Sequence, residues 1–352
     1  MKRRSFLKNA AWATVAAAAL PSLVSCKGEP EAKVSANMKF RPDGSFKLLQ
    51  FTDTHYIAGD PRSERALRCV EEALDAEKPD LVIHTGDILF GRPDIPSALE
   101  ILKPIAERGI PFAVALGNHD SQFGSSRVDV FDAIRALPGC LNTAPKDGVY
   151  GTSNDVITLS GHALERVFYL FDSMDAIILK GEEEIHCYDF IRHSQLGWYR
   201  AHSARFRERN GGKPVPSMAF FHIPPREVEE ALAVENRTLI GNYCEPPCPS
   251  RLNSGIVAQF RELEDVEAIV MGHDHDCDYV LSYSNMLYIY GRYSGCDTVY
   301  NHLGRSGWTD SEKVSGCRLF EFRSGEPGFR TWVRLFGGEV QQDLYLKDAK
   351  VV

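Results

Sequence analysis

Along the first part of the chain, short apolar runs alternate with segments in which apolar positions recur every three or four residues. The first pattern predicts a buried strand and the second an amphipathic helix. Leu67, Val70 and Leu74, for example, share one face of a predicted helix. The unit of strand, polar loop and helix recurs, with strands expected over 46–51, 81–83 and 112–116 and helices over 63–76, 95–108 and 128–137. Such units predict an α/β sheet whose polar residues gather at the carboxyl ends of its strands.

The rest of the chain is richer in predicted strands. Strands are expected over 156–159, 167–171, 218–221, 268–271, 279–283, 286–290, 317–322 and 331–336, and helices over 195–209 and 253–263. Ser284 and Asn285, between two of these strands, suit a tight turn. The periodicity therefore predicts an α/β fold with mixed sheets, and we expect two of them to pack face to face with helices outside.

Composition and charge narrow the function classes. A chain of 352 residues, 43% hydrophobic and 25% charged, can form one large domain or two small ones. Its formal net charge of -8 provides no overall basic surface, so a nucleic acid is not expected as a structural partner.

The N-terminus has the features of a targeting segment. Residues 2–8 (KRRSFLK) resemble a twin-arginine export signal, and the apolar stretch 10–20 is short for a membrane span. Residues 23–26 (LVSC) resemble a bacterial lipobox, in which Cys26 would carry the lipid. A plain secretory signal with a chance cysteine is the alternative.

These features predict a division of the chain into three parts. Residues 1–26 would be a twin-arginine and lipoprotein signal, 27–38 a flexible tether and 39–352 the main folded domain. We expect export from a bacterial cytoplasm and anchoring to a membrane through the lipid on Cys26, facing the periplasm or the exterior. An exported location permits disulfides, and Cys244 and Cys248 are the best pair by proximity; unpaired thiols are the alternative.

Aspartate, asparagine and histidine residues stand where the apolar runs end. They form five blocks, in chain order Asp53-Thr54-His55, Gly86-Asp87, Gly117-Asn118-His119-Asp120, Phe221-His222 and Gly272-His273-Asp274-His275. Imidazole and carboxylate groups of this kind suit zinc, iron or manganese. Each block alone has an ordinary structural explanation, such as a turn aspartate or a buried histidine, whereas the ordered set of five does not.

The ordered set resembles the calcineurin-like metallophosphoesterases, and the resemblance extends over nearly the whole chain after the leader. Residues 221–225 (FHIPP), 272–276 (GHDHD) and 290–292 (YGR) look most like the purple-acid-phosphatase-like branch. The resemblance implies a four-layer αββα sandwich of two mixed β-sheets with flanking helices. It also implies two metal ions, iron, zinc or manganese, and hydrolysis of a small phosphate monoester by a metal-bridging hydroxide. A phosphodiesterase or nucleotidase on the same metal core, and a non-catalytic metal- or phosphate-binding lipoprotein, are the alternatives.

The resemblance also implies a role for each residue of the blocks. Asp87 would bridge the two ions, one of them completed by Asp53, His55 and His275 and the other by Asn118, His222 and His273. The next histidine, His119, would donate a proton to the leaving group or stabilise the transition state. We expect Asp120 to hold the His119 imidazole, with a role in the loop or as a cap residue as the alternative.

Other residues near the blocks are open to two interpretations. Arg226 and Arg292 could clamp a phosphate, although structural salt bridges are the simpler expectation. Asp274 and Asp276 could orient the ligand histidines or cap their loop, and His84 is expected to pack in the core.

Two positions depart from the purple enzymes. These carry an iron-binding tyrosine shortly after the Gly-Asp block, where this chain has Phe90, and a glycine where this chain has His55. Phenylalanine cannot bind a metal, so we expect a metal pair like that of other metallophosphoesterases.

Overall fold

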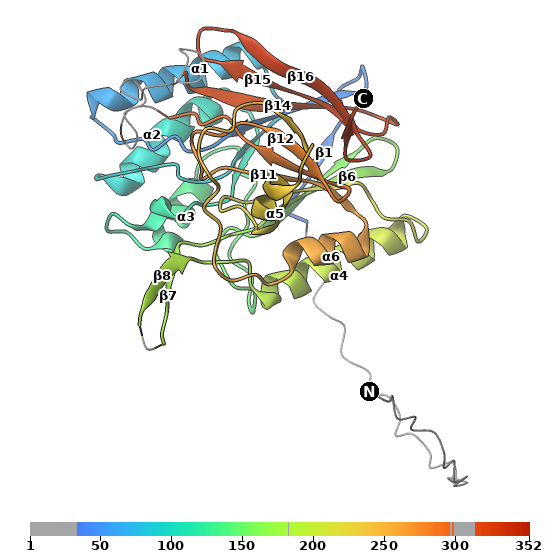
Figure 1. Cartoon of the computed structure of the whole chain (residues 1–352). Helices are drawn as coiled ribbons and strands as arrows, with labels where there is room; N and C mark the ends of the chain where they lie inside the picture. The colour runs from blue at the N-terminus through green and yellow to red at the C-terminus, as the bar shows by residue number, and fades with distance from the viewer. Residues whose placement is uncertain (1–33, 182, 296–297, 299–313) are drawn as a thin grey trace, which may run out of the picture. The chain divides into compact units, whose positions relative to one another are not determined.

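The computed structural model describes residues 34–181, 183–295, 298 and 314–352 (Figure 1). The predicted signal at 1–26, with Cys26, and the tether up to residue 33 lie outside these described residues. Among the described helices, none is both long and apolar enough to cross a membrane.

Two large mixed sheets form the centre of the compact unit that begins at Lys33. The seven-stranded sheet has the order β17-β16-β15-β14-β2-β3-β4, with β2, β3 and β4 parallel. Its strands are β2 (Ser45–Phe51), β3 (Leu81–His84), β4 (Phe112–Val114), β14 (Gly316–Arg323), β15 (Phe329–Leu335), β16 (Val340–Lys347) and β17 (Lys350–Val351).

The eight-stranded sheet has the order β1-β5-β6-β9-β11-β13-β12-β10. Its strands are β1 (Ala36–Lys39), β5 (Asp155–Ser160), β6 (Leu164–Leu170), β9 (Ser217–Phe220), β10 (Thr238–Ile240), β11 (Val266–Met271), β12 (Val280–Tyr283) and β13 (Met286–Tyr290). A separate hairpin of β7 (Ala176–Leu179) and β8 (Ile185–Tyr188) projects from the body of the unit (Figure 1).

Helices cover the outer face of each sheet. The longer ones are α1 (Glu64–Glu77), α2 (Asp94–Glu107), α3 (Arg127–Arg135), α4 (His193–Arg209), α5 (Glu227–Ala233) and α6 (Ile256–Leu263). In α1, Ala66, Val70 and Leu74 recur every four residues and form the buried face that packs on the seven-stranded sheet. Helices α4 to α6 pack in the same way on the eight-stranded sheet.

A third apolar cluster fills the space between the sheets. Leu48 and Ile83 come from the seven-stranded sheet, and Phe168 and Phe220 from the eight-stranded one, all fully buried. The layers are therefore helices, sheet, sheet and helices, which confirms the predicted αββα sandwich.

Most predicted elements are present, and the differences are local. The turn at Ser284 and Asn285 has positive φ at both residues, as a tight hairpin turn requires. The predicted tether of residues 27–38 is wrong at its end, because β1 begins at Ala36 and pairs in parallel with β5. The hairpin β7–β8, the short elements α5 and β10, and the C-terminal strands β16 and β17 have no counterpart in the predicted elements.

Candidate metal centre

The five blocks meet at one edge of the two packed sheets. Strands β2, β3 and β4 of the seven-stranded sheet lead into the loops of Asp53, Asp87 and Asn118. Strands β9 and β11 of the other sheet lead into those of His222 and His273. Since all five strands end at this edge, seven side chains from distant parts of the chain gather there and are buried: Asp53, His55, Asp87, Asn118, His222, His273 and His275.

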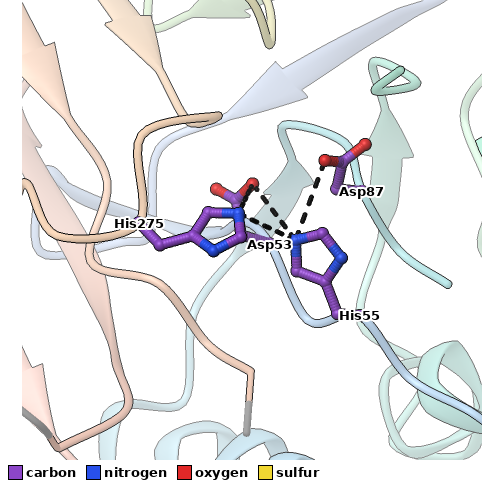
Figure 2. A group of neighbouring side chains, drawn as sticks. All are labelled: Asp53, His55, Asp87 and His275. Atoms are coloured by element: carbon purple, nitrogen blue, oxygen red, sulfur yellow. Dashed lines mark hydrogen bonds and ion pairs between the residues drawn. The ribbon is translucent and has the colours of Figure 1, made fainter. Parts of the chain in front are cut away.

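One group of donor atoms consists of Asp53, His55, Asp87 and His275, whose nearest atoms all lie within 4.8 Å of one another. His55 Nε2 lies 2.9 Å from His275 Nε2 and 3.7 Å from Asp53 Oδ1. Figure 2 shows the four side chains directed toward one point.

A second group consists of Asp87, His222 and His273. His222 Nε2 lies 3.1 Å from Asp87 Oδ2, 3.3 Å from His273 Nδ1 and 3.1 Å from the Oδ1 of Asn118. Asp87 Oδ2 also lies 3.7 Å from His55 Nε2, so the same oxygen faces both groups. Asp87 thus occupies the place of a bridge between two positions.

The donor set fits metal ions better than it fits a hydrogen-bonded core. At most one hydrogen can lie between His55 Nε2 and His275 Nε2, although both nitrogens turn toward the same point. Burial, and next the neighbouring His275, lower the pKa of His55 to about 4. Burial and His222 similarly lower the pKa of His273 to about 3. Both rings are therefore neutral at pH 7, the form in which imidazole binds a metal.

The carboxylates in the same site remain ionised. Burial opposes this, but His222 holds the pKa of both Asp53 and Asp87 below the usual range. Burial alone would lower the pKa of His222, and the two carboxylates instead raise it to about 9. The two carboxylates thus favour positive charge at this place in the site.

The backbone at the site is strained, as it often is where function sets the geometry. Asp53, His55, Asp87 and His273 all have positive φ, between 46° and 77°, which residues other than glycine seldom adopt. A Cβ on Gly117 would lie 2.2 Å from Asp87 Oδ1, so only glycine allows the loops of Asp87 and Asn118 to approach this closely.

His119 stands beside the two groups without joining either. Its Nε2 lies 4.0 Å from Asp87 Oδ2, and its side chain keeps 27% of its exposure. Its backbone N–H donates to Asp87 Oδ1 at 2.8 Å, which fixes the bridging carboxylate. The ring lines an open cleft of about 240 Å³ together with Tyr188, Glu245 and Cys248, so it can reach a molecule held at the metal centre.

The predicted pairing of Asp120 with the His119 ring is wrong. Asp120 is buried and accepts hydrogen bonds from the backbone N–H groups of Asp87, Ile88, Leu89 and Gly117. Its role is therefore the alternative one, in the loop. His119 Nδ1 instead contacts Gln122 Oε1, at 2.7 Å. Gln122 lies outside the five blocks, so no motif pointed to this contact.

Arg226, Arg292 and His84, which lie near the blocks, all have structural partners. Arg292 is buried and pairs with Asp278 at 2.8 Å, while Arg226 donates to the carbonyl oxygen of Arg251, so both have the structural partners that were the simpler expectation. His84 is buried in the core, as predicted, with Nε2 3.1 Å from Thr54 Oγ1.

Asp274 and Asp276 both have contacts that fix the loop after β11. Asp274 accepts from Tyr290 Oη at 2.6 Å and from the backbone N–H of Cys248, so it fixes the loop around the ligand histidines. Asp276 likewise has a loop contact, its backbone N–H donating to Glu245. Cys244 and Cys248 are not joined by a disulfide.

Comparisons with known proteins agree with this geometry. The sequence pattern of the calcineurin-like phosphoesterase family matches residues 46–277. Probable inactive purple acid phosphatase 28 of Arabidopsis thaliana is 29% identical over 336 residues, which cover 85% of this chain and 82% of that protein. Phosphatase DCR2 of Saccharomyces cerevisiae is 29% identical over 338 residues, 84% of this chain and 54% of that one.

A solved structure has the same fold. The crystal structure of a dimetal phosphatase from Danio rerio matches with a TM-score of 0.57 at 14% sequence identity, over 86% of this chain and 98% of that one. At this identity the likeness extends to the fold alone.

Proposed function

Because this chain belongs to the calcineurin-like phosphoesterase family, we propose that it is a dimetal-dependent hydrolase of phosphate monoesters. The observation that carries the proposal is the sharing of Asp87 between two buried groups of donor atoms. A single structural metal would need only one such group, closed on all sides. Two adjacent positions beside an open cleft suit a substrate that is held and hydrolysed.

The proposed ligands divide as the two groups do. Asp53, His55 and His275 would hold one ion and Asn118, His222 and His273 the other, with Asp87 shared between the two groups; iron, zinc and manganese all suit these donors. When bound, the ions supply positive charge to the phosphate oxygens and lower the pKa of a coordinated water.

The rest of the chemistry comes from the chain itself. His119 does not belong to either donor group, yet its Nε2 faces the same edge of Asp87. We assign to it the proton that the leaving oxygen needs, a contribution of about 10²–10⁴-fold in rate for a general acid. The buried Asp120 keeps the Asp87 loop in place during this step.

The relative from Arabidopsis thaliana is named probably inactive, which makes a non-catalytic metal- or phosphate-binding protein the competing proposal. Intact donor groups and an unligated histidine in the cleft favour catalysis in this chain. A purely structural metal site would have no use for the partly exposed His119 ring.

The test is a panel of substrates. The purified protein, loaded in turn with zinc, manganese and iron, is assayed on phosphate monoesters and on diesters, with Asp87→Ala as the matched control. We expect monoester hydrolysis that the variant lacks. Preferential hydrolysis of diesters would favour the phosphodiesterase alternative, and no hydrolysis of either class in metal-loaded protein would favour the binding protein.

Export and anchoring are a separate part of the proposal. The twin-arginine pattern at 2–8 and the lipobox ending at Cys26 suggest a lipoprotein held at a membrane outside the cytoplasm. Cys26→Ser should abolish lipidation, and Arg3→Lys with Arg4→Lys should block export. A mature N-terminus elsewhere than Cys26, measured by mass spectrometry, would contradict the anchor.

A further inference from the structure

A series of hydrogen bonds joins the hairpin β7–β8 to His119. Its base is closed by the backbone N–H of Asp189, which donates to the carbonyl oxygen of Asp175 at 3.0 Å. The Asp175 carboxylate accepts from Gln122 Nε2 at 2.9 Å, and Gln122 Oε1 lies 2.7 Å from His119 Nδ1. A continuous chain of hydrogen bonds therefore joins the hairpin to the ring in the cleft.

The donor and acceptor of each hydrogen bond in this series follow from the Asp175 carboxyl group at one end. Gln122 Nε2 lies 2.9 Å from Asp175 Oδ1, so the amide NH₂ of Gln122 donates to that carboxyl oxygen. The amide oxygen of Gln122 then faces the ring, and since it can only accept, His119 Nδ1 must carry a hydrogen. Nε2 is left as the nitrogen that faces Asp87 and the cleft.

The same hairpin touches the metal centre at its other end. The ring of Tyr188, the last residue of β8, packs edge-to-face on His273 with 4.3 Å between ring centroids. Asp175 and Tyr188 thus bracket the hairpin, one directed to His119 through Gln122 and the other to a proposed ligand. Phe90 also packs against His119, with ring centroids 4.7 Å apart, and limits the rotation of its ring.

We propose that Gln122 and Asp175 are positioning residues that hold His119 with its hydrogen on Nδ1 and its Nε2 toward the reacting phosphate. Nε2 is then the nitrogen that takes up a second proton, and the doubly protonated ring gives this proton to the leaving oxygen and returns to the Nδ1–H form. The inference rests on the phosphoesterase function proposed above, in which His119 serves the leaving group. It takes over the task that the sequence had suggested for Asp120.

The first test reads the hydrogen directly and needs no activity. In protein loaded with zinc, which is diamagnetic, long-range ¹H–¹⁵N correlations of the labelled histidines identify the tautomer of each neutral ring. We expect the His119 signals, assigned by their loss in His119→Ala, to show hydrogen on Nδ1. We expect a mixture of tautomers in Asp175→Leu. Hydrogen on Nε2 in the unmodified protein, or no change in Asp175→Leu, would overturn the inference.

The second test uses a charge swap. Gln122→Glu alone sets two carboxylates against each other, and kcat for an alkyl phosphate should fall about 10–100-fold, the usual cost of losing such a supporting contact. Adding Asp175→Asn lets the new carboxylate accept from both His119 and the new amide. The double variant should recover to within a few-fold of the unmodified enzyme. Recovery no better than that of Gln122→Glu would overturn the proposal.

Two controls separate positioning from general damage. Gln122→Leu should lower kcat about 10–100-fold, whereas Gln341→Leu, the same chemical change on strand β16 of the seven-stranded sheet, should leave kcat unchanged. In a His119→Ala background, Gln122→Leu should cause no further loss, because it acts only through that ring. An additional loss of the same size would mean that Gln122 acts elsewhere. If the protein hydrolysed no phosphate ester, the proposed function would be refuted. The tautomer measurement would still test whether Gln122 and Asp175 hold the hydrogen of His119 on Nδ1.

Discussion

Asp120 Oδ2 accepts the backbone N–H of Asp87 at 3.1 Å, so one buried carboxylate fixes the loop that presents the other. Burial, and next the charge of Asp87, raise the pKa of Asp120 to about 6. The hydrogen bonds that Asp120 accepts from the backbone oppose this rise, and the same hydrogen bonds hold the loops of Asp87 and Gly117 in place.

Replacing Asp120 should therefore disturb the metal centre and not the leaving-group chemistry. Asp120→Ala leaves several buried N–H groups without an acceptor, and each such loss costs about 1–3 kcal/mol. We expect a loss of about 3 kcal/mol in unfolding free energy and reduced metal content, measured by denaturant titration and elemental analysis. If Asp120→Ala kept normal stability and metal content but its hydrolysis rate depended differently on the leaving group, the predicted pairing of Asp120 with His119 would be supported instead.

The sequence predicted the elements that carry the site because their signals are local. Each strand that ends in a ligand is a short apolar run, and each block is contiguous. The contact between Gln122 and Asp175 spans 53 positions and leaves no periodic trace. The hairpin that brings Asp175 in also escaped prediction, because its strands are only four residues each and carry exposed apolar side chains such as Ile178 and Ile185.

Replacing Phe90 with tyrosine should create a visible absorption band in the iron-loaded protein. Its ring packs against His55, with 5.2 Å between ring centroids, so the residue that replaces the purple-type tyrosine lies at the metal centre. Iron-loaded protein should lack a purple charge-transfer band, and Phe90→Tyr should introduce one in the visible spectrum. An intense band in the unmodified protein, lost on changing some tyrosine, would show a different set of ligands.

Glu77 should make part of the stability depend on pH. Burial would raise its pKa, but hydrogen bonds from Arg334, Lys47 and Trp332 lower it overall. A lowered carboxyl pKa contributes stability above its unfolded value, about 4.3, and that contribution is lost as pH falls through the folded value.

Glu77→Gln should accordingly cost about 1–3 kcal/mol at pH 7, with the difference from the unmodified protein shrinking below about pH 4. Denaturant titrations across this range measure it. Glu107→Gln, which alters an exposed helical pair with Lys103, should change stability by less than about 0.5 kcal/mol. A Glu77→Gln difference that stays constant down to pH 3 would contradict the linkage.

His119 tests the mechanism through the leaving group. An alkoxide needs a proton as it departs, whereas nitrophenolate scarcely does. His119→Ala should therefore slow alkyl phosphate hydrolysis about 10²–10⁴-fold and nitrophenyl phosphate hydrolysis far less, with metal content unchanged. An equal fall for both substrates would assign His119 to charge stabilisation or positioning, and a loss of metal would make it a ligand.

The most direct measurement of the central claim is metal content and monoester hydrolysis on the same samples of the unmodified protein and Asp87→Ala. Asp132→Ala, an exposed carboxylate on α3, serves as the control. We predict two ions per chain with activity in the unmodified protein and the control, and loss of both ions and of activity in Asp87→Ala. Two fully occupied ions in Asp87→Ala, or a metal-loaded unmodified protein that hydrolyses no phosphate ester, would contradict it.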